Sequence, residues 1–168
     1  ASAFVHKELK GHIICDALAE YEFYESGVVT TPVAATNTAD DFIGKAEDMW
    51  IYFTGGLTIE NLTNRIIGVP YERQRILGVQ MYYYDIKGFL QWGYNFYNVQ
   101  YSIKAINPYE VTDAGGAFPS GHSFVVYPAE NGEAYESLRL KVFYDAFQDL
   151  SALKALEKKI GRDKVIEI

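Results

Sequence analysis

The sequence contains one cysteine and three histidines in 168 residues. Cys15 therefore has no partner for an intrachain disulfide, and three scattered histidines do not supply the ligand set of a zinc site. No apolar run approaches the length of a membrane span, and no signal peptide is visible. We expect a cytoplasmic chain without metal or other cofactor. Because the sequence does not begin with Met, we also expect a piece of a longer protein, whose N-terminus would hide any signal.

Basic residues are also in the minority. The chain has 15 Lys and Arg against 22 Asp and Glu, which gives a formal net charge of -7 and a pI near 4.9. Binding to nucleic acid or to an anionic membrane needs a basic patch that displaces counterions. This composition argues against both kinds of partner.

A phosphatase-like tetrapeptide occurs in GAFPSGHSF, residues 116–124. In such a signature His122 would attack phosphorus, but it is the last histidine of the chain and no Arg-Pro pair is present. Nothing would then protonate the leaving group or hold the phosphate. We predict instead that Pro119, Ser120 and Gly121 form a turn that leads into a strand over 123–128.

Aromatic residues are abundant. They make up 15% of the chain, and 14 of them are tyrosines. Tyrosine combines an apolar face with a polar tip, which suits sugar-binding clefts and partner interfaces. A tyrosine-rich core explains the same composition, and the sequence leaves the two interpretations open.

Strand and helix patterns alternate along a single predicted domain, residues 1–168. Short apolar runs predict strands over 11–17, 28–35, 49–54 and 87–93; helical patterns occupy 19–24, with a stop at Gly27, and 71–85, after Pro70. Residues 94–117 have no regular pattern. A hairpin should follow, with strand 124–127 turned back by Asn131-Gly132, and then a long helix from Ser137 to Gly161. Its predicted apolar face comprises Leu140, Phe143, Phe147, Leu150, Leu153 and Ile160.

This order implies parallel strands with right-handed crossovers. About four such strands amount to half of an eight-stranded barrel. The predicted fold class is therefore α/β, a partial (β/α) TIM-type barrel: a C-terminal half-barrel with an added β-hairpin and a long C-terminal helix.

Several segments carry a resemblance to a known family. They are CDALAEYEFY (15–24), RILGVQMY (75–82), IKGFLQWGYNFY (86–97) and ESLRL (136–140), with Asp149 further on. From about Gly11 to Gly161 the chain resembles the C-terminal part of a bacterial family that carries the domain of unknown function 4091 and overlaps glycoside hydrolase family 123.

The resemblance implies a barrel glycosidase acting on β-linked N-acetylhexosamines. In the implied mechanism the acetamido oxygen of the substrate attacks the anomeric carbon, an Asp orients the acetamido group, and an adjacent Glu is general acid and then base. No Asp-Glu pair occurs in the chain. Glu47-Asp48 has the reverse order and precedes a strand, and Asp40-Asp41 lies in a polar connection as a solvated helix start. We expect no catalytic residue in this chain, a dyad upstream of it, and an inactive isolated chain.

Substrate-binding residues are expected where barrel strands end. Asp16, Tyr52 and Trp92 lie at strand ends, and Tyr94 and Asn95 come just beyond the last strand. Each has an alternative: Trp92 as a core residue under the final helix, Tyr52 as core, and Asp16 or Asn95 as the cap of its own turn.

Arg65, Arg73 and Arg75 are further candidates for contacting a charged substrate. Arginines on a helix surface more often form ion pairs with nearby acids.

A different class of function remains open. A non-catalytic carbohydrate-binding module, or a structural or interaction module, fits a half-barrel without the dyad. The expected partners are a glycan containing N-acetylhexosamine and either the upstream half of the barrel or a second copy that covers the open sheet edges. Asn61-Leu62-Thr63 is a formal glycosylation sequon that has little meaning without evidence of secretion.

Overall fold

The computed structural model describes residues 2–55 and 62–168. The element order is α1 (Ser2–Glu8), β1 (Cys15–Leu18), α2 (Glu22–Glu25), β2 (Thr31–Ala35), η1 (Ala39–Asp41), β3 (Trp50–Tyr52), α3 (Tyr71–Arg75), α4 (Leu77–Tyr83), β4 (Gly88–Leu90), η2 (Gln100–Ser102), β5 (Val126–Pro128), β6 (Ala134–Glu136), α5 (Leu138–Ile160) and α6 (Arg162–Ile166). The strand predicted over 49–54 should end at Gly55-Gly56; Gly56 and Asn61 of the sequon lie outside the described residues. Among the described helices none is long and apolar enough to cross a membrane.

Four parallel strands form the main sheet in the order β1-β2-β3-β4. The predicted parallel pairing and mixed α/β class are confirmed, although each strand is shorter than its apolar run. Pro32 lies opposite Asp16 of β1, but pairing with β3 starts only one residue later, at Val33. Proline is tolerated here because β2 is not yet paired on both sides. The outer strands of this sheet are β1 and β4.

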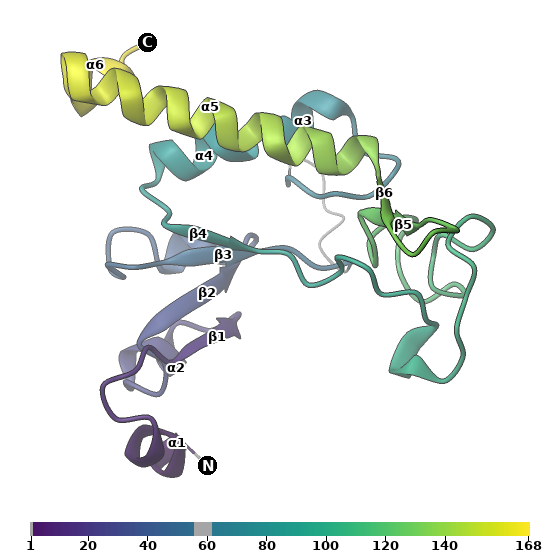
Figure 1. Cartoon of the computed structure of the whole chain (residues 1–168). Coiled ribbons are helices and arrows are strands. Elements are labelled where there is room, and N and C mark those ends of the chain that lie inside the picture. Colours follow the sequence, from purple (N-terminus) through teal and green to yellow (C-terminus); the bar gives the residue numbers. More distant parts are fainter. Residues whose placement is uncertain (1, 56–61) are drawn as a thin grey trace.

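The long helix α5 lies across the top of the molecule, and α4 lies between it and the sheet (Figure 1). Helix α3 also packs against α5. The hairpin β5–β6 and the segment that precedes it lie to one side of this stack (Figure 1). The sequence predicted one helix over 71–85, but the structure divides it into α3 and α4 at Ile76. The short helices α1 and α6 were not predicted.

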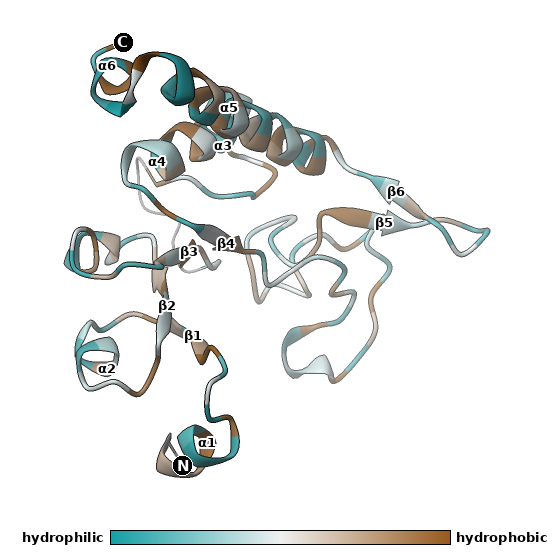
Figure 2. Ribbon diagram, turned by 60° about the vertical axis from the view of Figure 1, so that its left-hand side comes forward, coloured by the Kyte–Doolittle hydropathy of each residue, from teal (hydrophilic) through white to brown (hydrophobic). Residues whose placement is uncertain are grey.

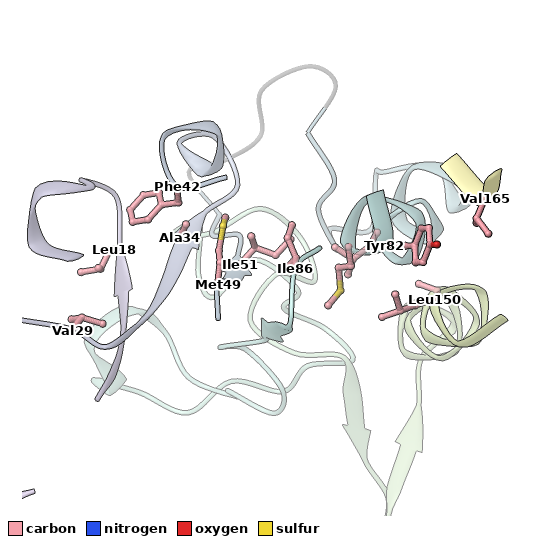
Figure 3. Packing of buried hydrophobic residues seen from close by; sticks show 13 residues of the cluster. Leu18, Val29, Ala34, Phe42, Met49, Ile51, Tyr82, Ile86, Leu150 and Val165 are labelled. Atoms are coloured by element: carbon pink, nitrogen blue, oxygen red, sulfur yellow. The ribbon is translucent and has the colours of Figure 1, made fainter. Parts of the chain in front are cut away.

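The core lies between the helices and the sheet. Its buried members include Leu18, Val29, Ala34, Phe42, Met49, Ile51, Leu77, Met81, Tyr82, Ile86, Ala146, Leu150 and Val165 (Figure 3). Strand β2 is buried along its whole length, as expected for an inner strand of a parallel sheet. Tyr82 is the one tyrosine among the buried core residues of the described chain, so a tyrosine-rich core does not explain the composition.

Helix α5 begins and ends where the sequence predicted. The hydroxyl of Ser137 accepts a hydrogen bond from the backbone N–H of Leu140, and Gly161 ends the helix at φ +86°. Hydrophilic and apolar residues alternate along it (Figure 2). The predicted face is confirmed in part, because Leu150 is buried and Phe143, Phe147 and Leu153 pack against the core. Arg139, Val142 and Ala146, which the pattern did not include, are buried as well. Ile160 was predicted to face the core but is 37% exposed.

Residues 94–117 are largely irregular, as predicted, apart from η2. Tyrosine hydroxyls connect this segment to the hairpin: Tyr97 donates to the Val126 carbonyl at 2.9 Å and Tyr109 to the Pro128 carbonyl at 2.9 Å. Strands β5 and β6 pair antiparallel as predicted, with Gly132 in the turn at φ +81°. Part of the tyrosine content therefore serves to order a long irregular segment.

Helices α4 and α5 approach closely at Gly78. A Cβ added there would lie 1.8 Å from the carbonyl oxygen of Ala146, so the backbones would have to separate. We predict that Gly78→Ala lowers the free energy of unfolding by about 1–3 kcal/mol, as overpacking does. Urea unfolding monitored by circular dichroism measures this. Gly68→Ala is the control, because a Cβ at that position would meet no atom within 4 Å; equal stability of the two variants would contradict the prediction.

Candidate functional site

A pocket of about 340 Å³ opens beyond the carboxyl ends of β3 and β4, and its lining is Thr54, Gly55, Trp92, Phe118 and His122. Thr54 follows the last residue of β3 by two positions, and Trp92 follows the last residue of β4 by two. Parallel strands bring their carboxyl ends to one edge of a sheet, where α/β proteins usually bind ligands. The lining places this pocket at that edge.

Trp92 presents a partly open aromatic surface to the pocket. It is 36% exposed, and its ring packs against Phe118 at a centroid distance of 5.3 Å and Phe96 at 5.8 Å. Its indole Nε1 lies 3.2 Å from Nδ1 and 3.3 Å from Nε2 of His122, so the indole N–H donates to the imidazole. These contacts fix the position of the indole, and its exposed part leaves apolar surface for a ligand.

His122 is suited to accept this hydrogen bond because it is neutral. It is 2% exposed, and burial lowers its pKa from 6.5 to about 4; an interaction with the backbone of Phe53 opposes the shift, and the charge of Arg139 adds to it. Residues 119–122 form the predicted turn, in which the N–H of His122 donates to the carbonyl of Pro119 at 3.0 Å. Its contacts make it a positioning residue for Trp92.

Two glycines allow the two chain segments to meet at the pocket. A Cβ at Gly93 would lie 2.6 Å from the carbonyl oxygen of His122, and a Cβ at Gly55 would lie 2.8 Å from Cδ of Pro119. Any side chain at either position would push the turn away from the strand ends. The pocket therefore depends on glycine at both positions.

Arg139 fixes the other side of the same turn. Its Nη1 donates to the carbonyls of Gly121, of Arg65 at 3.1 Å and of Phe124 at 2.8 Å. The guanidinium is 7% exposed and comes from the first turn of α5. One side chain thus joins the segment after β3, the turn that bears His122, and the start of the final helix.

Arg65 is 1% exposed, which contradicts the expectation that it lies on a helix surface and pairs with an acid. Its guanidinium carbon lies 3.3 Å from the ring centroid of Phe143, and Nη1 donates to Oε1 of Gln91 at 3.0 Å. Gln91 in turn donates to the carbonyl of Gly93 at 3.3 Å. Arg65 therefore supports the turn that carries Trp92.

The other arginines follow the expectation only in part. Arg75 forms a two-pronged ion pair with Asp149 at 2.7 and 2.8 Å, and this raises the pKa of Arg75 and lowers that of Asp149. Arg73 is exposed.

Comparison with known proteins adds the family. The family model for the glycoside hydrolase 123 catalytic domain matches residues 1–156. The chain belongs to this family. No curated protein matches it.

Of the residues predicted to bind substrate, Trp92 lines the pocket of this glycoside hydrolase 123 chain, and the other four are not among its lining residues. Asp16 was expected at the end of its strand but is the second residue of β1, where it is exposed. Its Oδ1 accepts the N–H of Ala17 within the same strand at 2.8 Å, so it does not cap the turn that follows. Tyr52 is half-buried at the end of β3, and burial raises its pKa. Tyr94 and Asn95 are exposed, and Asn95 bridges to Phe124. Their roles in binding stay predictions.

Sequence reasoning missed Thr54, Phe118 and the pocket-lining role of His122. His122 lies 30 positions from Trp92 in the chain, so no local spacing signals their contact. Within the described residues no Asp or Glu lines the pocket, and no group of three or more His, Cys, Asp or Glu is placed to hold a metal ion. Asp40 and Asp41 are exposed in η1, as predicted, and Glu47 and Asp48 are exposed ahead of β3.

Burial of neutral His122 makes stability depend on pH. The imidazole titrates near 6.5 when unfolded and near 4 when folded, so the unfolded chain binds more protons between these values. We predict that the free energy of unfolding is insensitive to this group above pH 6.5 and falls by up to about 3 kcal/mol as the pH is lowered to 4. Urea unfolding between pH 4 and 8 measures the slope.

His122→Gln keeps an acceptor for Trp92 but does not titrate, so the slope should decrease. His12→Asn, at an exposed histidine, is the matched control and should keep it. An unchanged slope in His122→Gln would contradict the assignment.

Proposed function

We propose that this chain supplies part of the substrate-binding wall of a hydrolase that acts on β-linked N-acetylhexosamines. Its membership of the glycoside hydrolase 123 catalytic-domain family, over residues 1–156, supports the hydrolase and its carbohydrate substrate. The single structural observation that carries the binding role is the pocket at the carboxyl ends of β3 and β4, with Trp92 as its aromatic surface.

The proposed reaction is assisted by the substrate. The acetamido oxygen attacks the anomeric carbon while a protonated Glu donates its proton to the departing glycosidic oxygen, and the same Glu then deprotonates the water that opens the cyclic intermediate. An adjacent Asp orients the acetamido group. We propose that both acids come from a segment outside this chain, because its sequence has no Asp-Glu pair.

Trp92 is suited to the acetamido end of such a substrate. A sugar ring or an acetamido methyl group packs well on a flat aromatic surface, and the hydrogen bond to His122 keeps that surface at a fixed angle. Phe118 and Thr54 supply an apolar wall and a hydroxyl at the rim. This chain thus contributes binding and orientation rather than proton transfer.

The proposal includes the half-barrel and the relation to the domain of unknown function 4091. The sheet has four parallel strands, which is half the number in a closed eight-stranded barrel. Strands β1 and β4 are the sheet's outer strands, and we propose that the upstream half of the barrel, or a second copy of the chain, pairs with them.

A non-catalytic carbohydrate-binding module is the second candidate. It is favoured by the absence of an Asp-Glu pair from the 168 residues. A hydrolysis assay separates the two candidates. Chromogenic β-N-acetylgalactosaminide and β-N-acetylglucosaminide are offered to this chain and to a longer form that carries the preceding sequence.

We expect turnover by the longer form alone. Turnover by neither form would contradict the hydrolase proposal and favour the binding module.

Substitution of Trp92 tests the binding role directly on this chain. We predict that Trp92→Ala weakens binding of N-acetylglucosamine or N-acetylgalactosamine about tenfold, the loss expected from one aromatic stacking surface. Saturation-transfer NMR and calorimetry measure the affinity. Trp50→Phe is the control, because Trp50 packs on Gly88 within the sheet and does not line the pocket; equal affinity of both variants would contradict the role of Trp92.

A further inference from the structure

A second cavity lies on the opposite side of the turn that bears His122. It is a groove of about 380 Å³, a size within the usual range for small-molecule sites, and it is lined by Ile67, Val69, Tyr71, Gln74, Tyr127, Ser137, Leu138, Arg139 and Val142. Its walls come from the segment before α3, from α3 itself, from β5 and from the first turn of α5. Apolar side chains form most of these walls.

Arg139 brings an unbalanced positive charge to this groove. Its Nη1 is used by three carbonyls, whereas its buried Nη2 has no hydrogen-bond partner among the described residues. The described salt bridges do not include Arg139 either. Buried charges are normally paired, because an isolated one loses its hydration without compensation.

Arg65 adds a second buried cation next to the first. The Arg139 guanidinium is 3.1 Å from the Arg65 carbonyl, and Nε and Nη2 of Arg65 also lack partners among the described residues. Burial lowers the pKa of both side chains, and the charge of Arg139 lowers that of Arg65 further. An anion close to Arg139 would therefore stabilise both guanidinium groups.

The polar groups around the groove are mixed: the amino end of α5 suits an anion, whereas Oε1 of Gln74 is a buried acceptor without a partner among the described residues. The groove includes the amino end of the 23-residue helix α5, where backbone N–H groups lack intrahelical acceptors and the helix dipole is positive. Burial lowers the pKa of Arg139, and the nearby Tyr127 opposes part of that shift. The nearest acids in sequence are already engaged, Glu136 with Lys141 and Asp145 with Tyr71.

We propose that the groove between α3, β5 and the start of α5 binds a small organic monocarboxylate, with its carboxylate at Arg139 and its apolar body between Ile67, Val69 and Leu138. Arginine forms strong charge-assisted hydrogen bonds with carboxylates, and here Nη2 of Arg139 is left for one such bond. The apolar side chains of Ile67, Val69 and Leu138 suit an apolar ligand body better than the hydroxyls of a sugar. The site does not depend on the proposed glycosidase function, because the turn at Gly121 separates the groove from the Trp92 pocket.

The test compares an acid with its neutral analogue on this chain. Calorimetry and amide NMR titrations use 4-phenylbutyrate and 4-phenylbutan-1-ol, which share the apolar body and differ in the carboxylate. We expect the acid to bind at least tenfold more tightly, with the largest shifts at the amides of Leu138 and Arg139. Equal binding of the two probes, or no binding of the acid, would overturn the proposal.

Variants at Leu138 provide controls that do not threaten the fold, because this residue is 72% exposed at the rim of the groove. Leu138→Glu places a tethered carboxylate at the rim and should abolish binding of 4-phenylbutyrate, whereas Leu138→Gln should bind it within about threefold of the wild type. Equal affinity of Leu138→Glu and Leu138→Gln for 4-phenylbutyrate would contradict an anion-binding site in the groove.

Trp92→Ala should leave this affinity unchanged. Unchanged affinity would show that 4-phenylbutyrate does not bind in the Trp92 pocket. A loss of binding in Trp92→Ala would place the ligand in that pocket and overturn the proposal.

Discussion

The buried guanidinium of Arg139 is the interaction on which both cavities depend. It binds the carbonyls of Gly121 and Phe124 together with that of Arg65, which is far from the other two in the sequence. Burying a cation is costly, and three accepting carbonyls offset part of that cost. The geometry that results places His122 on one side of the turn and the groove on the other.

The aromatic site depends on this arrangement indirectly. His122 is neutral because it is buried, and only a neutral imidazole accepts the indole N–H of Trp92. Arg65 supports the same tryptophan from the strand side, through Gln91 and the Gly93 carbonyl. Two buried arginines thus orient one aromatic surface without touching it.

Local patterns predicted the parts of the fold that local physics decides. Short apolar runs predicted the four parallel strands, Asn131-Gly132 predicted the hairpin, and Ser137 and Gly161 marked the ends of α5. Each depends on a periodicity or on a residue whose backbone preference acts within a few positions. Trp92 could be singled out for the same reason, since it follows a strand end.

The remaining features depend on contacts between distant segments. The break at Ile76 has no proline or glycine to signal it, and Arg65 looks like a surface residue until three aromatic rings surround it. The contact between Trp92 and His122 requires glycine at position 93, whose purpose is visible only once the turn packs against it. Sequence spacing carries no record of such pairings.

The order of the elements, with α5 after the sheet and α4, has a consequence for synthesis on the ribosome. Strands β1 to β4 each pair with the next in sequence, so the sheet can assemble as the chain emerges. Leu77 and Met81 of α4, however, are buried with Ala146 and Leu150, and Arg75 meets Asp149, 74 residues later. Until α5 leaves the exit tunnel, the apolar side of α4 is bare, which makes the nascent chain prone to aggregation during this interval.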